Sequence, residues 1–326
     1  MTTRPRAEDL TLPEPARSLL SRTRGILDTY VTPRTPDRSG WIIGGGTILA
    51  ARWRHRESRD IDLLVHPRTE TRFLQPATAP ELHRRLEAAG ARKISFGRFS
   101  QILFAESKIE MLAAEPQPRI GHRRALVDGR EATTLTSSQI LTGKFANRSL
   151  NPPVRDLYDF AVAGTSAPRA LMIAVNALAG NDIRWRLVSW EMEREKFAEE
   201  GPMELHGVPL QYEAVRADPT HYASQAVMGA VYQHVRLHVQ DGEAVVETRA
   251  QLARETRTCD RPDDLANWFE QDGINALLSA AGIDPERIRD ETASAMRTGG
   301  NTVILEIDQD RSAWGPYLPK MGEAPG

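Results

Sequence analysis

Two aspartates, Asp60 and Asp62, stand on either side of a single isoleucine at the start of the apolar stretch DIDLLV. Side chains on a strand alternate between two faces, so the two carboxylates project together and Ile61 enters the opposite face. Neighbouring carboxylates repel each other unless a cation lies between them, and Mg²⁺ (or Mn²⁺) commonly takes one or two carboxylates together with substrate phosphates. Taken alone, the pair also fits a solvated strand end.

Three glycines, Gly44, Gly45 and Gly46, follow an apolar strand and precede a helix that opens at Thr47. Backbone N–H groups at the N-terminus of a helix can approach a phosphate there without obstruction by side chains. The alternative is an ordinary tight turn between a strand and a helix. The spacing excludes two other phosphate motifs, because no Gly-Lys-Ser/Thr opens the helix and because Leu49 stands where the dinucleotide fingerprint needs a small residue.

A second polar segment, LTGKFANRSLNPPVRDLYDFAV, has its own helical spacing. Lys144 and Arg148 lie four residues apart on one helical face, and two prolines end that helix. The next helix places Asp156 and Asp159 three residues apart, a like-charge pair that requires a nearby cation. Lys144 is the candidate for that cation, or for a direct contact with a triphosphate. A solvated helix face with Asp159 paired to Arg155 is the alternative.

The elements that must position these residues alternate between strands and helices up to about Gly164, which is typical of an α/β arrangement. The periodicity of apolar residues predicts helices at 15–30, 47–56, 79–90, 137–149 and 153–163, and strands at 41–43, 60–65, 92–97, 101–105 and 108–113.

The remainder of the chain is predicted to be mainly helical. Helical spacing covers 167–179, 182–199, 220–236, 248–257, 262–281 and 284–297. Two stretches depart from it: an Asp-Gly turn in VRLHVQDGEAVVETRA predicts a hairpin, and NTVILEID near the end predicts a strand. We therefore divide the chain into an N-terminal helix and linker over 1–39, a domain over 40–164 and a mainly helical domain over 165–326.

Composition limits the class of protein. The chain has 326 residues, 40% of them hydrophobic, which is enough for two domains with cores of their own. Lys and Arg number 42 against 44 Asp and Glu, so a nucleic-acid partner would have to be held by a local patch. The single cysteine, Cys259, fits a reducing compartment. The N-terminus lacks the apolar core of a signal peptide and no apolar run is long enough to cross a bilayer, so we expect a soluble, cytoplasmic protein without a membrane partner.

The motifs together resemble a known family. Gly46-Thr47, twelve residues and then Asp60-Ile61-Asp62 are similar to the DNA polymerase β-like nucleotidyltransferase superfamily. More narrowly, GGGTILAARWRHRESRDIDLLV resembles the AbiEii/AbiGii toxin family, including its tRNA-modifying MenT-type toxins, with the pattern Gly-Gly-Thr, a helix and His-Arg-x-Ser-x-Asp-(Ile/Leu)-Asp. The resemblance resumes at LTGKFANRSLNPPVRDLYDFAV. It implies an α+β fold, with a polymerase β-like nucleotidyltransferase domain (a small mixed sheet with flanking helices) followed by a mainly helical domain.

The resemblance also implies roles for particular residues in a metal-dependent nucleotidyltransferase that uses an NTP and releases pyrophosphate. Asp60 and Asp62 would hold the metal, and Lys144 and Asp156 match the family's active-site lysine and aspartate. The superfamily supplies a third carboxylate from a later strand. In SKIEMLA the apolar residues alternate with Glu110, which makes Glu110 the candidate for this metal ligand, with Glu106 as the nearby alternative.

Nucleotide contacts are predicted at the helix start and in basic side chains. Arg52 and Arg56 share a helical face, and guanidinium forks suit phosphate oxygens, although a solvated face is the alternative. His55 is predicted to pack or form hydrogen bonds, because no second histidine lies at the spacing of metal ligands. The predicted nucleotide-binding set is Gly45, Gly46, Thr47, Arg52, Arg56 and Arg148.

The acceptor is predicted from the resemblance as the 3′ end of tRNA, with growth arrest in a toxin–antitoxin or phage-defence system and a cognate antitoxin as partner. The helical half would recognise the RNA, but Trp185 and Trp190, at helical spacing, are predicted to lie in the core and not to stack on bases. Transfer to a small molecule or to a protein keeps the same chemistry with another acceptor. A catalytically silent nucleotide-binding module is the alternative from another functional class.

Overall fold

The structure, a computed structural model, describes residues 7–31, 40–65, 74–97, 99–113, 122–148, 150–178 and 180–308. The chain forms two compact units. Unit 1 comprises residues 1–140 and 205–211, and unit 2 comprises 141–204 and 212–326. The sequence-based boundary, after residue 164, lies further along the chain than the observed boundary after residue 140. The part of the predicted linker at 32–39 lies outside the described residues.

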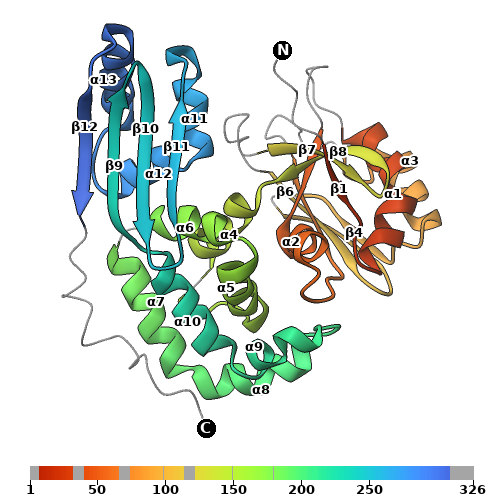
Figure 1. Ribbon diagram of the computed structural model, residues 1–326. Coiled ribbons are helices and arrows are strands. Elements are labelled where there is room, and N and C mark those ends of the chain that lie inside the picture. Colours follow the sequence, from red (N-terminus) through yellow and green to blue (C-terminus); the bar gives the residue numbers. More distant parts are fainter. Residues whose placement is uncertain are drawn as a thin grey trace. The chain divides into compact units, whose positions relative to one another are not determined.

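Unit 1 is built on an eight-stranded mixed sheet with strand order β1-β7-β8-β2-β3-β6-β5-β4 (Figure 1). Its strands are β1 (Glu8–Leu10), β2 (Trp41–Gly44), β3 (Ile61–Val65), β4 (Lys93–Ser95), β5 (Phe99–Leu103), β6 (Lys108–Ala113), β7 (His122–Val127) and β8 (Arg130–Leu135). Its helices are α1 (Ala16–Tyr30), α2 (Gly45–Trp53) and α3 (Pro80–Ala88), and α4 (Ser137–Asn147) continues into unit 2.

The centre of this sheet is apolar on one face because strand residues alternate. Ile61, Leu63 and Val65 of β3 are buried, whereas Asp62 and Leu64 between them are partly exposed on the other face. Ile43 of β2 is also fully buried. The alternation that predicts the position of the two aspartates therefore also builds the core beneath them.

Unit 2 begins with a helical bundle. Its helices are α5 (Val154–Ser166), α6 (Pro168–Asn176), α7 (Gly180–Met192), α8 (Arg194–Glu204), α9 (Glu213–Ala217) and α10 (Pro219–Ala230), and a short 3₁₀ turn spans Leu210–Tyr212. Helix α5 packs closely along α10 at Gly164, where an added Cβ would lie only 2.8 Å from the Cβ of Ala226. Phe145, Phe160 and Trp190 stack on one another in the core, with ring centroids 4.0 Å apart for the two phenylalanines.

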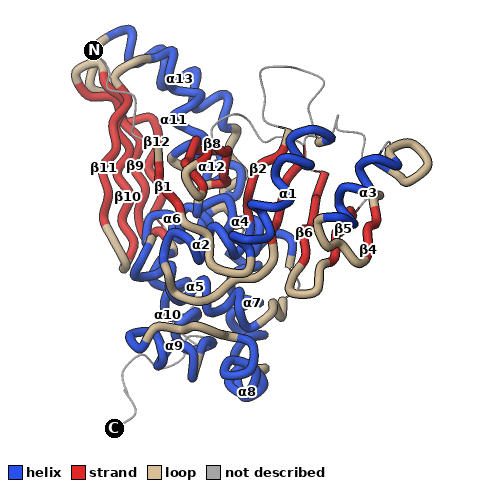
Figure 2. The backbone as a smooth tube through the Cα atoms, turned by 90° about the vertical axis from the view of Figure 1, so that its right-hand side faces the viewer, coloured by secondary structure: helices blue, strands red, loops and turns tan. Residues whose placement is uncertain are grey.

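A four-stranded antiparallel sheet follows, in the order β11-β10-β9-β12. Its strands are β9 (Tyr232–Gln240), β10 (Glu243–Ala250), β11 (Arg254–Cys259) and β12 (Thr302–Asp308). Three helices, α11 (Leu265–Gln271), α12 (Ile274–Ala280) and α13 (Pro285–Thr298), lie on one side of this sheet after a 3₁₀ turn at Pro262–Asp264 (Figure 2). Asn176 joins this sheet to the bundle, since its side chain donates to the Ala230 carbonyl and accepts from the Tyr232 N–H.

The predicted α+β fold is confirmed, as are the hairpin at Asp241-Gly242 and the strand at NTVILEID. Two predicted helices need correction. The segment 248–257 is not helical but forms the end of β10 and the start of β11. The helix predicted over 220–236 ends at Ala230, and β9 begins at Tyr232. Cross-strand pairing with β9 and β10 overrides the local helical spacing in both places.

Candidate active site

The three predicted metal-binding carboxylates lie on one face of the sheet of unit 1. Asp62 on β3 lies directly opposite Glu110 on β6, a parallel neighbour, so their side chains share a face. Asp60 stands two residues earlier, immediately before β3, and therefore on the same side. The side chains of Asp60 and Glu110 are 27% and 37% exposed, so a ligand can reach them.

Gly45 is required beside Asp62 for two separate reasons. Gly44 pairs with Asp62 across β2 and β3, and the chain turns into α2 at Gly45 with a φ of +67°. That φ is unfavourable for residues with a side chain. In addition, a Cβ at Gly45 would lie 1.7 Å from Oδ2 of Asp62. The carboxylate thus lies against the N-terminus of α2, where the helix dipole favours negative charge.

Thr47 holds the segment that carries Asp60. The Thr47 hydroxyl donates to the main-chain carbonyl of Asp60 and lies 2.8 Å from the Ser58 hydroxyl. Thr47 is 1% exposed. Its predicted contact with phosphate stays a prediction, whereas its visible function is to fix the start of α2 to the residues that lead into β3.

A lysine lies among the carboxylates. Nζ of Lys108, the first residue of β6, is 2.8 Å from Oε1 of Glu110 and 3.9 Å from Oδ2 of Asp60. Gln101, opposite Glu110 on β5, donates from Nε2 to the same Oε1 at 2.7 Å. Lys108 thus brings an ammonium group to two of the three carboxylates of this cluster.

This donor set suits a divalent cation, because Mg²⁺ and Mn²⁺ prefer carboxylate oxygens and the ligands lie on neighbouring strands of one sheet face. Among the described residues, the group whose possible ligand atoms all lie within 4.8 Å of one another is a different one, His234, Glu306 and Asp308. There Nδ1 of His234 lies 2.8 Å from Asp308 and Nε2 lies 3.7 Å from Glu306. The imidazole thus stands between two exposed carboxylates, with Asp308 at hydrogen-bonding distance.

Glu106, the alternative to Glu110, lies elsewhere. It stands in the turn between β5 and β6, where it forms an ion pair with Arg22 of α1. A backbone hydrogen bond and the Arg22 guanidinium lower the pKa of the Glu106 carboxyl below its usual value. The structure therefore places Glu110, and not Glu106, beside Asp62.

Three basic residues of the segment 52–56 are engaged within the protein. Arg52 donates to both carboxylate oxygens of Glu8 and to the Leu135 carbonyl, at 2.8–3.2 Å, and its side chain is 7% exposed. Arg52 therefore clamps α2 to β1 and β8, which leaves its guanidinium poorly placed for a phosphate. Arg56 is 9% exposed and donates to the Glu57 carbonyl. His55 is buried beside the Trp53 ring, in agreement with the prediction that it packs.

In unit 2, the second predicted cluster is a buried ion-pair network. Nζ of Lys144 contacts Asp156 and lies 3.0 Å from Oδ2 of Asp159, while Nε of Arg148 lies 3.1 Å from Oδ2 of Asp156. The two carboxylates are 1% and 0% exposed. Lys144 is thus the cation that the spacing of the two aspartates requires, and a pairing of Asp159 with Arg155 on a solvated face is excluded. The predicted roles of Lys144, Arg148 and Asp156 toward a nucleotide stay predictions.

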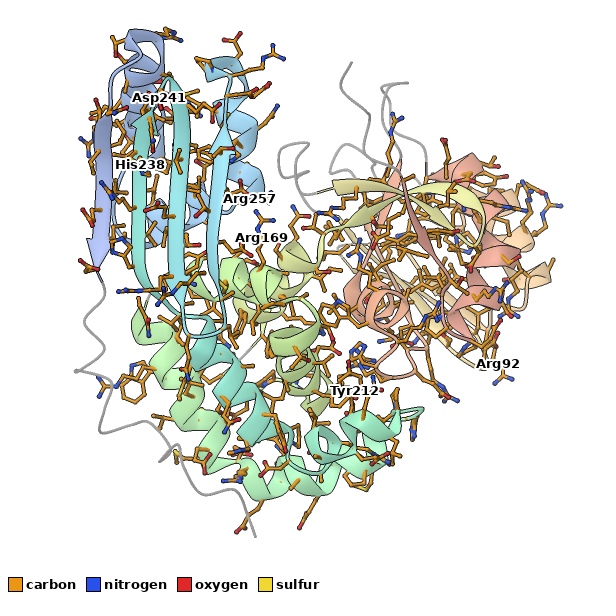
Figure 3. All side chains as sticks on the ribbon, in the orientation of Figure 1. Arg92, Arg169, Tyr212, His238, Asp241 and Arg257 are labelled. Atoms are coloured by element: carbon orange, nitrogen blue, oxygen red, sulfur yellow. The ribbon has the colours of Figure 1, made fainter. Side chains whose placement is uncertain are left out.

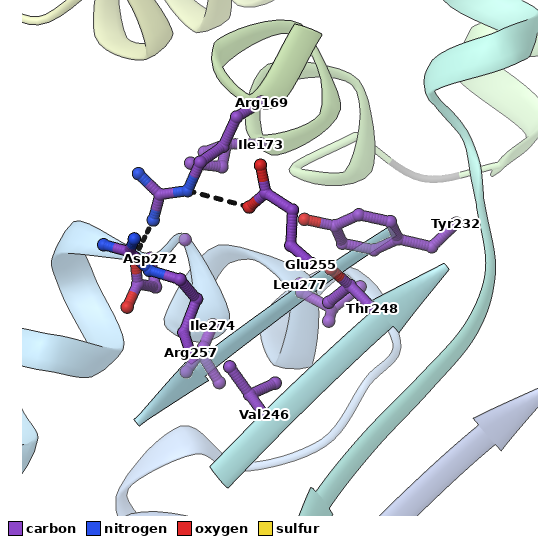
Figure 4. A pocket seen from close by; sticks show the side chains of 11 residues that line it. Arg169, Ile173, Tyr232, Val246, Thr248, Glu255, Arg257, Asp272, Ile274 and Leu277 are labelled. Atoms are coloured by element: carbon purple, nitrogen blue, oxygen red, sulfur yellow. Dashed lines mark ion pairs between the residues drawn. The ribbon is translucent and has the colours of Figure 1, made fainter. Parts of the chain in front are cut away.

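A small pocket in unit 2 was not foreseen from the sequence. It lies between α6, α12 and the helix-covered side of the sheet, where Arg169 and Arg257 approach Asp272 (Figures 3 and 4). Arg169 contacts Asp272 and lies 3.0 Å from Glu255, and Arg257 lies 3.6 Å from Asp272. Burial lowers the pKa of Arg169 and raises that of the nearby Tyr232 to about 12. With a volume of about 20 Å³, the pocket has room for about one water molecule.

Lys108, Gln101 and Ser58 are the residues of this site that the sequence analysis does not single out. Lys108 stands two residues before Glu110, so strand alternation alone places it on the same face. Ser58 is part of the HRESRD motif but is given no role there. Gln101 could be found only from the pairing of β5 with β6, which the sequence does not specify.

The mixed sheet of unit 1 carries three carboxylates on one face, next to a glycine turn that opens a helix. Residues 29–225 match the family described as nucleotidyl transferase AbiEii toxin, type IV TA system. The match spans more than half of the chain, and the chain belongs to this family. Membership implies nucleotidyl transfer in a toxin–antitoxin system, with an NTP as substrate and an antitoxin as partner. The matched region ends within α10, so the four-stranded sheet of unit 2 lies beyond it.

Two solved structures are similar to the chain. The crystal structure of JHP933 from Helicobacter pylori is 13% identical, with a TM-score of 0.39, and the alignment covers 66% of this chain and 93% of that one. A second H. pylori structure, described as a proposed nucleotidyltransferase, is 12% identical with the same TM-score, covering 66% and 94%. No curated protein matches the chain. None of the helices in the described ranges is long and apolar enough to cross a membrane.

Proposed function

We propose that the chain transfers a nucleoside monophosphate from an NTP to the 3′ end of tRNA, with Mg²⁺ or Mn²⁺ as cofactor, and thereby arrests growth until an antitoxin counteracts it. The observation that carries the chemistry is the placement of Asp60, Asp62 and Glu110 on one sheet face beside the glycine turn of α2. The reaction is expected in the cytoplasm, where NTPs and tRNA are found.

In the proposed reaction, the acceptor hydroxyl oxygen attacks the α-phosphorus in line with the bond to the β-phosphate. A phosphoester bond forms, the bond between the α-phosphorus and its bridging oxygen breaks, pyrophosphate leaves and the hydroxyl proton passes to solvent. Asp60, Asp62 and Glu110 would hold the divalent cation, which supplies charge neutralisation and lowers the pKa of the attacking hydroxyl. The free N–H groups at the start of α2, at Gly45 and Gly46, would orient the phosphates.

An exposed tryptophan favours RNA among the acceptors. Trp190 is buried in the aromatic stack of unit 2, as predicted, but Trp185 is 63% exposed on α7, which contradicts its predicted place in the core. Its chain neighbours are Arg184 and Arg186. Base stacking on an aromatic ring together with guanidinium contacts to the backbone is a common mode of single-strand binding.

The test is incubation of the purified protein with Mg²⁺, total tRNA and each α-³²P-labelled NTP in turn, beside the Asp60→Asn/Asp62→Asn variant. Label on tRNA that is absent with the double variant supports the proposal and identifies the nucleotide. Pyrophosphate release that requires a small-molecule or protein acceptor would contradict the tRNA assignment. Lack of turnover with every acceptor would favour a silent nucleotide-binding module.

The contribution of Trp185 can be separated from the chemistry. Trp185→Ala should weaken tRNA labelling by about tenfold, because one stacked base contributes about 1–3 kcal/mol. Met192→Ala is the matched control, since Met192 is 83% exposed on the same helix but offers no ring for stacking. Equal labelling by both variants would contradict a stacking role for Trp185.

A further inference from the structure

Lys108 holds an unusual position for a residue without an assigned role. In the register of β3 and β6, Ile61 pairs with Ile109 and Asp62 with Glu110, so Lys108 lies across from Asp60. Its ammonium group lies within reach of both Glu110 and Asp60, at 2.8 and 3.9 Å. A positive charge thus stands at the oxygens that the proposed function assigns to the metal.

The carboxylates need this charge when no metal is bound. Three acidic side chains on adjacent strand positions repel one another, and like charges directly opposite on neighbouring strands are destabilising. Lys108 supplies positive charge here, because its ammonium group forms ion pairs with both Asp60 and Glu110. A divalent cation at the same oxygens would be repelled by the ammonium group, so both cannot occupy this position at once.

The side chain of Lys108 is able to move, whereas its backbone is held. It is 31% exposed and stands at the first residue of β6, on a flexible four-carbon stem. The preceding residue, Ser107, is anchored through its hydroxyl to the Arg59 carbonyl. Lys144 in unit 2 differs, because it is 10% exposed and contacts two carboxylates that are almost fully buried.

We propose that Lys108 is an exchangeable counter-ion of the carboxylate site. Its ammonium group neutralises Asp60 and Glu110 in the metal-free protein and leaves them when a divalent cation binds, so that Lys108 lowers the affinity for the metal. The inference rests on the proposed metal site and adds a residue that regulates its occupancy. This exchange stabilises the metal-free protein and couples metal binding to the movement of the Lys108 side chain.

The experiment measures Mn²⁺ binding to the full-length protein by electron paramagnetic resonance, together with thermal unfolding in EDTA. Lys108→Met keeps the length of the side chain and removes its charge, and Lys108→Arg keeps the charge. Lys93→Met is the matched control, because it removes a lysine from β4, two strands away from β6 in the same sheet. Asp62→Asn reports on the metal site itself.

Lys108→Met should bind Mn²⁺ about tenfold more tightly than wild type, equivalent to about 1.4 kcal/mol, and should unfold at a lower temperature in EDTA. Lys108→Arg and Lys93→Met should remain close to wild type in Mn²⁺ affinity. Unchanged or weaker Mn²⁺ binding by Lys108→Met, while wild type binds and Asp62→Asn does not, would overturn the counter-ion role and leave the proposed function standing. Equal Mn²⁺ binding by wild type and Asp62→Asn would overturn the metal site, and the counter-ion role with it.

Discussion

The two acidic clusters of the protein solve the same electrostatic problem in opposite ways. In unit 1, Asp60, Asp62 and Glu110 lie on a sheet face that solvent reaches, with one lysine among them. In unit 2, Asp156 and Asp159 are almost fully buried and contact Lys144, and Arg148 pairs with Asp156. The buried cluster thus holds two basic side chains against its two carboxylates, whereas the open cluster lies within reach of solvent.

This difference separates a site that can take a ligand from one that is already complete. A buried carboxylate pair must be neutralised by the protein itself, because burial of an unpaired charge is strongly unfavourable. Carboxylates grouped at a partly exposed position suit a divalent cation. We therefore expect loss of charge to affect mainly the activity in unit 1 and mainly the stability in unit 2.

The largest effect on stability is expected at Lys144. Lys144→Met removes the ammonium group that contacts both Asp156 and Asp159, so the free energy of unfolding should fall by about 3–5 kcal/mol. The double variant Lys144→Met/Asp159→Asn keeps the Arg148–Asp156 pair and should recover part of this loss. Urea denaturation checks both values. Wild-type stability of Lys144→Met would show that the cluster is not a structural network.

Gly45 tests whether the space occupied by Asp62 matters. Gly45→Ala introduces both an unfavourable φ and a Cβ that overlaps the Asp62 carboxylate, so transfer should be lost and stability should fall by about 1–3 kcal/mol. Gly129→Ala is the matched control, with a φ of +75° but no heavy atom within 4 Å of the added Cβ. Transfer assays and thermal unfolding should show a similar strain in both and a loss of activity in Gly45→Ala alone.

Thr47 tests how firmly Asp60 must be held. Thr47→Val removes the hydroxyl that bonds the Asp60 carbonyl, so stability should fall by about 1 kcal/mol and transfer by about tenfold. Thr23→Val is the control, because this buried hydroxyl bonds a carbonyl within α1 and should change stability alone. Equal transfer rates for the two variants would contradict a positioning role for Thr47.

The smallest effect concerns the buried thiol of Cys259 in unit 2. Burial raises the pKa of the Cys259 thiol, so the thiolate that reacts with disulfide reagents is depleted at neutral pH. Labelling of the folded protein should be at least about tenfold slower than labelling of the urea-unfolded chain. The rate should rise with pH above the ordinary thiol pKa. Equal rates in both states would show that this region of unit 2 is not closed to solvent.

The site could be predicted to the extent that it depends on local spacing. Alternation along a strand is enough to bring Asp60 and Asp62 together and to choose the face of Glu110, and a glycine turn before a helix is visible in the sequence. The contact between the Thr47 hydroxyl and the Asp60 carbonyl joins residues 13 apart through a turn. Such a contact depends on the path of that turn, which the residue pattern does not determine.

The secondary structure shows the same contrast between local signals and contacts made at a distance along the chain. Strands β7 and β8 are joined by Asp128-Gly129, both with positive φ, as β9 and β10 are joined by Asp241-Gly242. The Asp-Gly turn predicts the second hairpin, and Asp128-Gly129 carries the same signal in the sequence. For 248–257, by contrast, the helical spacing predicts the wrong structure. This segment forms the end of β10 and the start of β11, and it is held by the pairing of β10 with β9 and with β11.

The central claim, that the open carboxylates of unit 1 hold the catalytic metal, is tested most directly by Asp62→Asn. The measurement is the rate of pyrophosphate release from NTP with Mg²⁺ and total tRNA, beside thermal unfolding, with Asp128→Asn as a control in a turn of the same unit. The account predicts a rate about a thousandfold lower for Asp62→Asn, with an unfolding temperature close to wild type, and near-normal activity for the control. A rate for Asp62→Asn within about tenfold of wild type would contradict it.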